Sequence, residues 1–176
     1  MDFLAVGILG SLWGSFANVC IYRLPLKGGV VKGRSFCPKC KKKIFWYENI
    51  PILSYLILGG KCSKCKKKIS TQYLLVEVIS IFSFLIIYYL FGISLTTILL
   101  IILFLSFLII FFIDLKYYII PDILTFPMMV LGFVKSFDPN LNPIFPNYTN
   151  SLLGGIIGYG IIWLIIMFYK KIRNRE

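Results

Sequence analysis

The sequence predicts an all-α polytopic membrane protein, with about five transmembrane helices and a small cytoplasmic loop domain built on four cysteines. The composition is the first reason: 59% of the 176 residues are hydrophobic, only 15% are charged, and the mean hydropathy is +0.85. The second is a series of apolar runs long enough to cross a bilayer. The third is that one long polar segment, residues 35–77, holds four of the five cysteines.

The apolar runs define three regions of the chain. We expect the first span in residues 1–22, a cytoplasmic domain in 23–72 and a second membrane-embedded region in 73–176. The first run is predicted to be a retained span rather than a signal peptide, because Asp2 stands where a basic region is needed. The expected spans cover residues 3–22, 73–91, 95–113, a shorter 123–133 that Pro121 and Pro127 bend, and 151–169.

The positive charge lies between and after these spans. The net charge is +12, and residues 23–72 alone contain thirteen Lys or Arg against one acid, Glu48. A basic loop between spans is typical of the cytoplasmic side, and the same rule places the basic tail, residues 170–176, inside and residues 135–150 outside. The distribution therefore favours membrane topology over nucleic-acid binding as the reason for the charge.

Two Cys-x-x-Cys pairs, Cys37/Cys40 and Cys62/Cys65, are separated by 21 residues. This spacing is typical of one tetrahedral zinc site, because each short turn points two thiolates at the same ion. Disulfides are the alternative, and the reducing cytoplasm argues against them. The fifth cysteine, Cys20, has no partner and is expected to be a small buried apolar residue.

Polar groups inside the spans leave two interpretations open. Glu77 lies one turn inside the second span, where it either snorkels to the nearby lysines or has a function. One face of the first span is polar and either bonds to another helix or faces substrate, while closely spaced glycines allow another helix to approach. The polar residues are Ser11, Ser15, Asn18 and Tyr22, and the glycines are Gly7, Gly10 and Gly14.

Asp114 is the candidate catalytic residue. It follows more than a dozen apolar residues at the cytoplasmic edge of the third span, where we expect it to be buried and suited to general acid–base work. The alternative is an interfacial anchor paired with Lys116. The chain has no histidine, so carboxylate chemistry is the main hydrolytic mechanism that the sequence offers.

Several motifs, in order along the chain, resemble those of type IV prepilin peptidases. They are Gly14-Ser15-Phe16-Ala17-Asn18-Val19 through Arg23-Leu24-Pro25, Cys-Pro-x-Cys, residues 46–56 (WYENIPILSYL), Gly60-Lys61-Cys62, Tyr73 with Val76-Glu77, and Ile113-Asp114 with Pro121-Asp122. The resemblance covers almost the whole chain.

The resemblance implies a multi-pass enzyme of the bacterial inner (plasma) membrane that cleaves the basic leader of type IV prepilins. Pseudopilins of type II secretion or uptake systems are the related substrates. It also implies S-adenosylmethionine-dependent N-methylation of the new N-terminus. Zinc at the four cysteines, and contact with membrane lipid but not with nucleic acid, are expected from the residues themselves. A membrane-tethered nucleic-acid-binding zinc ribbon is disfavoured, because the motif around Trp46 is explained without nucleic acid.

Proteolysis in the family that this sequence resembles uses two aspartates. Asp114 matches the first, and Asp122 matches a motif residue that is not the usual second catalyst. The second lies in a Gly-x-Gly-Asp motif after the last span, and these 176 residues contain no such motif. We therefore expect an N-terminal portion of a prepilin peptidase that needs a partner segment carrying Gly-x-Gly-Asp. The alternative is a truncated or split, non-proteolytic membrane zinc protein that binds pilin leaders.

The predicted topology can be tested by cysteine labelling of intact cells on a Cys20→Ser background. A membrane-impermeant maleimide should label an Asn142→Cys variant from outside, because residues 135–150 carry too little positive charge to be held inside. An Asn174→Cys variant should be labelled only after the cells are permeabilised. Labelling of the Asn174→Cys variant in intact cells would contradict the orientation.

Overall fold

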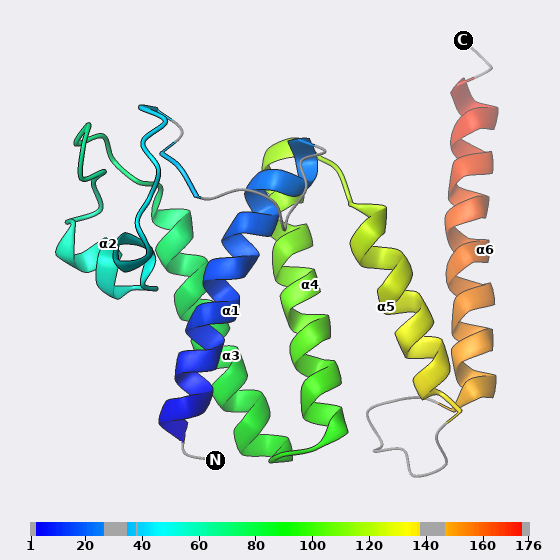
Figure 1. The fold of residues 1–176 in the computed structure, drawn as a ribbon. Coiled ribbons are helices and arrows are strands. Elements are labelled where there is room, and N and C mark those ends of the chain that lie inside the picture. Colours follow the sequence, from blue (N-terminus) through cyan, green and yellow to red (C-terminus); the bar gives the residue numbers. More distant parts are fainter. Residues whose placement is uncertain (1–2, 27–34, 38, 138–146, 174–176) are drawn as a thin grey trace. The chain divides into compact units, whose positions relative to one another are not determined.

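The structure, a computed structural model, describes residues 3–26, 35–37, 39–137 and 147–173, and within these the chain is helical with no strand. This confirms the predicted all-α class. The chain divides into two compact units, Met1–Thr125 and Phe126–Glu176, each of which is described by itself. The helices (Figure 1) are α1 (Phe3–Arg23), α2 (Leu53–Ile57), α3 (Thr71–Phe91), α4 (Leu95–Tyr117), α5 (Asp122–Lys135) and α6 (Tyr148–Arg173), with short 3₁₀ helices η1 (Leu24–Leu26) and η2 (Trp46–Asn49).

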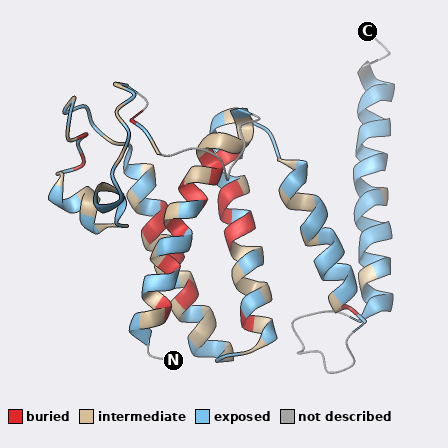
Figure 2. Cartoon of the chain, viewed as in Figure 1, coloured by how far each residue is buried: buried red, intermediate tan, exposed pale blue. Residues whose placement is uncertain are grey.

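Helices α1, α3 and α4 pack together in the first unit. In Figure 1, α1 and α4 run in the same direction and α3 runs in the opposite one. The buried residues lie where these three helices face one another, and the outward faces are exposed (Figure 2). Exposed apolar side chains on such helices are expected when lipid rather than water covers them.

The contact between α1 and α3 depends on glycine. A Cβ atom built on Gly14 would lie 2.8 Å from the Cα of Glu77, and one on Gly10 would lie 2.9 Å from the Cα of Ile81. No side chain fits at such distances, so the two backbones touch as in small-residue packing between membrane helices. The predicted role is confirmed for Gly10 and Gly14, but Gly7 is not at the close approach, because its Cβ would meet nothing closer than 3.9 Å.

In the part of the chain that the structure describes, four helices, α1, α3, α4 and α6, are long and apolar enough to cross a membrane. Helix α5 has 14 residues, or about 21 Å at 1.5 Å per residue, which is short of a hydrocarbon core of about 30 Å. It contains Pro127 and is the short element that the sequence predicted. Parts of the loop that is predicted to lie outside and of the basic tail, residues 138–146 and 174–176, are not among the described residues, and neither are 27–34 and Pro38.

Replacing Gly14 should test the α1–α3 contact. Gly14→Ala forces a methyl group against the backbone of α3, and we expect a loss of about 1–3 kcal/mol of stability, as for other overpacked sites. Gly7→Ala is the matched control on the same helix, because its Cβ would meet nothing closer than 3.9 Å. Thermal unfolding in detergent should show a lower Tm for Gly14→Ala only. Equal stability of the two variants would contradict the close approach.

Candidate functional site

The two Cys-x-x-Cys segments fold into turns with the same hydrogen bonds. In the first, the Cys37 N–H donates to the Lys42 carbonyl (2.9 Å) and the Lys41 N–H donates to the Cys37 carbonyl (2.8 Å). In the second, the corresponding bonds join Cys62 to the Lys67 carbonyl (2.9 Å) and Lys66 to the Cys62 carbonyl (3.0 Å). Lys41 and Lys66 both have positive φ, at 54° and 57°. The repeated sequence therefore gives two equivalent turns, here called the knuckles (residues 36–43 and 61–68).

The four cysteine sulfurs converge on one point. The Sγ atoms of Cys37, Cys40, Cys62 and Cys65 all lie within 4.8 Å of one another, and the described cysteines are free thiols. The Cys37–Cys65 and Cys40–Cys62 Sγ pairs are 3.9 and 4.0 Å apart. Four sulfurs placed tetrahedrally at about 2.3 Å from a zinc ion would be about 3.8 Å apart, so this cluster has the size to hold one such ion.

Backbone amides favour the thiolate form of one cysteine in this cluster. The N–H groups of Cys65 and Lys64 bond to the Cys62 sulfur and lower the pKa of its thiol to about 6. A thiol with that pKa is largely thiolate at neutral pH, and the thiolate is the form that binds metal.

Lys42 joins the two knuckles. Its Nζ donates to Glu48 Oε1 at 2.7 Å and to Ser63 Oγ in the second knuckle at 2.6 Å. The hydrogen bond from Lys42 lowers the pKa of Glu48 to about 2, aided by a bond involving Ser63 and by the Phe45 N–H. The carboxylate is thus ionised at physiological pH. Sequence reasoning missed this link, because nothing in the six-residue spacing of Lys42 and Glu48 predicts it.

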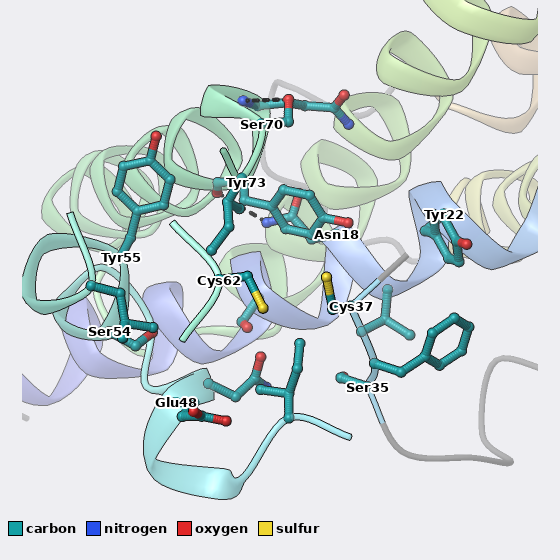
Figure 3. A pocket seen from close by; sticks show the side chains of 18 of the residues that line it. Asn18, Tyr22, Ser35, Cys37, Glu48, Ser54, Tyr55, Cys62, Ser70 and Tyr73 are labelled. Atoms are coloured by element: carbon teal, nitrogen blue, oxygen red, sulfur yellow. Dashed lines mark hydrogen bonds between the residues drawn. The ribbon is translucent and has the colours of Figure 1, made fainter. Parts of the chain in front are cut away.

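A cavity of about 540 Å³ lies between the knuckles and the adjoining ends of α1 and α3. Figure 3 shows its labelled side chains, among them Asn18 and Tyr22 from α1, Tyr73 from α3, and Cys37 and Cys62 from the two knuckles. Lys116 in the last turn of α4 also lines it. The cavity therefore joins the cysteine cluster to the helical bundle.

The polar face predicted on the first span has two parts, one that lines the cavity and one that makes hydrogen bonds within or between helices. Ser15, Asn18 and Tyr22 line the cavity, whereas the Ser11 hydroxyl donates to the Ile8 carbonyl in its own helix. Asn18 is 4% exposed, and its Nδ2 donates to the Tyr73 carbonyl of α3 at 3.0 Å. Its Oδ1 has no partner among the described residues. The face thus both joins two helices and borders the cavity.

Glu77 does not snorkel to lysines. It is 8% exposed, and its Oε2 accepts a hydrogen bond of 2.7 Å from the backbone N–H of Ile52, in the segment between the knuckles. Its carboxylate also accepts a hydrogen bond from the Ser15 side chain of α1. The position of Glu77 inside a span indicated from the sequence that its carboxylate needs a partner. The sequence did not predict that this partner is the backbone N–H of Ile52. Cys20 is buried, as predicted.

The prediction that Asp114 is buried is wrong for the described residues. Ile113 is fully buried, while Asp114, about 100° further round α4, is exposed. The alternative pair with Lys116 is not formed either: the described residues have no salt bridge between the two, and the Lys116 Nζ lies 4.9 Å from the centroid of the Tyr117 ring. Asp122 is the first residue of α5 and is also exposed.

Known protein families match nearly the whole chain. Residues 8–91 match the family model of the bacterial peptidase A24 N-terminal domain, and residues 100–172 match that of the type IV leader peptidase family. A prepilin leader peptidase/N-methyltransferase of Vibrio cholerae is 36% identical over 94% of this chain and 68% of its own length. The chain belongs to the prepilin leader peptidase family.

Other members of the prepilin leader peptidase family are similarly related. Proteins of the same name from Neisseria gonorrhoeae and Pseudomonas aeruginosa are 33% and 30% identical, each over 96% of this chain. The alignments cover 66% and 65% of those proteins, so the chain spans about two thirds of the length of these relatives. No solved structure matches it. The first family model contains the knuckles and Glu77, and the second contains Asp114.

Proposed function

We propose that this protein processes type IV prepilins, or pseudopilins of secretion and uptake systems, at the cytoplasmic face of the bacterial plasma membrane. The proposed reactions are removal of the basic leader and methylation of the new N-terminus. The observation that carries the proposal is the family membership, with Asp114 in the last turn of α4, two residues before the cavity-lining Lys116. The thirteen cations of residues 23–72 support a cytoplasmic position for this end.

In the peptidase step, Asp114 is proposed as one catalytic carboxylate. Aspartic proteases divide the work, because one carboxylate activates water while the other, protonated, polarises the scissile carbonyl. Exposure of Asp114 at a helix end leaves its carboxylate open to water and to an extended peptide. We assign the second role to the Gly-x-Gly-Asp motif that the family resemblance implies, rather than to Asp122.

In the methylation step, the cavity is proposed to hold S-adenosylmethionine, which supplies an electrophilic methyl group. Its walls offer the hydroxyls of Tyr22 and Tyr73, groups suited to a ligand with several polar atoms. Lys116 lines the same cavity, so a peptide N-terminus released near Asp114 has a short way to travel.

The cysteine cluster is proposed to bind one zinc ion that holds the knuckles folded. Residues 23–72 have too little apolar core to fold without a cross-link, and four thiolates at the observed distances suit zinc. The surrounding lysines offset the negative charge of such a site.

Zinc content tests the metal proposal. The purified protein should contain about one zinc per chain, as expected for a four-thiolate site. A Cys37→Ser, Cys62→Ser double variant should lose the metal, and chelation should make the knuckles sensitive to protease. Cys20→Ser is the matched control and should retain zinc, because Cys20 lies buried outside the cluster. Unchanged zinc in the double variant would refute the site.

The choice of Asp114 is tested by prepilin cleavage in membranes. The 176-residue chain alone should not cleave, and adding a segment with Gly-x-Gly-Asp, fused or co-expressed, should give activity. Asp114→Asn should then lower the rate by at least about a hundredfold, as expected for loss of an acid–base group.

Asp122→Asn is the matched control in this assay and should leave measurable activity. Cleavage by the unsupplemented chain would show that the second carboxylate was assigned wrongly. Activity that survives Asp114→Asn would show that Asp114 was wrongly assigned as the first carboxylate.

A further inference from the structure

The segment between the two knuckles, residues 45–58, is apolar in a part of the chain that is otherwise basic. Glu48 is its only charged residue, whereas lysines crowd both flanks, at positions 41–43 and at 61, 64 and 66–68. Trp46 and Ile57 are 81% and 82% exposed. The other large exposed side chains of the segment are Phe45, Tyr47, Ile50, Leu53 and Leu56. So many exposed apolar side chains within one short segment indicate a contact site.

The position of this segment along the helices shows what it contacts. The Ile52 N–H bonds to Glu77, which lies six residues, or about 9 Å, along α3 from its first residue Thr71. The second partner of Glu77, Ser15, lies eight residues or about 12 Å before the end of α1. Figure 1 shows α2 beside the two helices rather than beyond their ends. The segment therefore reaches a level inside two membrane spans.

A strained turn fixes the segment at this depth. Ile52 has φ 60° and ψ −53°, and the Leu53 N–H bonds to the Pro51 carbonyl at 2.6 Å, which together define a γ-turn of the rare positive-φ type. Such a conformation is costly for a β-branched residue and persists only where its surroundings hold it. The buried Glu77 carboxylate provides that hold through the Ile52 N–H.

We propose that residues 45–58 are a membrane-interface anchor, whose apolar side contacts the boundary between acyl chains and headgroups. The exposed aromatic residues, Trp46 and Tyr47, are the types enriched at that level. The lysines of the knuckles, which flank the anchor on both sides, suit anionic phospholipid headgroups. Lipid is favoured over a protein partner by this order of apolar centre and basic flanks. The inference rests on the membrane spans α1 and α3 and not on the proposed peptidase activity.

Tryptophan quenching in vesicles tests the anchor in the full-length protein. Trp13→Phe and Trp163→Phe leave Trp46 as the sole emitter, and the vesicles contain phosphatidylglycerol with or without phospholipids brominated near the headgroup end of the acyl chains. The matched control adds Trp46→Phe and Lys64→Trp, which moves the emitter to an exposed position in the second knuckle.

We expect brominated lipid to quench Trp46 at least about three times more strongly than the control emitter, and aqueous acrylamide to show the reverse order. Glu77→Ala should reduce the lipid quenching of Trp46, because it removes the acceptor for Ile52, whereas Glu77→Gln retains an acceptor and should preserve it. Acrylamide quenching of Trp46 equal to that of the control would overturn the proposal. Protection of Trp46 from both quenchers would also overturn it, by showing that protein covers the segment.

Discussion

The close contact between α1 and α3 determines most of the other distances at this site. Gly10 and Gly14 bring the two backbones together, since a Cβ on either would lie within 3 Å of the opposite helix. At this separation Asn18 reaches the Tyr73 carbonyl and Ser15 reaches Glu77. The residues that make these polar contacts also line the cavity, together with residues of the two knuckles. A membrane interface built from small residues thus positions groups that lie at its edge.

The cavity and the candidate catalytic carboxylate occupy the same end of the first unit. Lys116 lines the cavity, and Asp114 is exposed in the same helical turn. Under the proposed function, in which the cavity is the methylation site, such proximity is useful because the cleaved peptide need not leave the protein between the two steps. The two family models match separate parts of the chain, residues 8–91 and 100–172, yet residues from both parts line this cavity.

Features encoded by local spacing could be predicted from the sequence. The cysteine cluster follows from two identical Cys-x-x-Cys turns, and the α1–α3 packing follows from glycines one helical turn apart. The burial of Asp114 was predicted from its depth in the span, but exposure depends on helical phase, and it is Ile113 that faces the core. The contact of Glu77 with Ile52 depends on a positive-φ turn at a β-branched residue, a conformation that no local pattern predicts.

The bond between Asn18 and Tyr73 has a consequence for metal binding. It joins the helix that leads into the cysteine segment to the helix that leads out of it, so the intervening residues form a loop whose ends are already together. Closing a loop of this length costs entropy, and the membrane helices have met that cost before any ion arrives. The four thiolates consequently experience a higher effective concentration of one another than they would in an excised peptide. The membrane-spanning helices would thereby increase the affinity of the cysteine cluster for an ion.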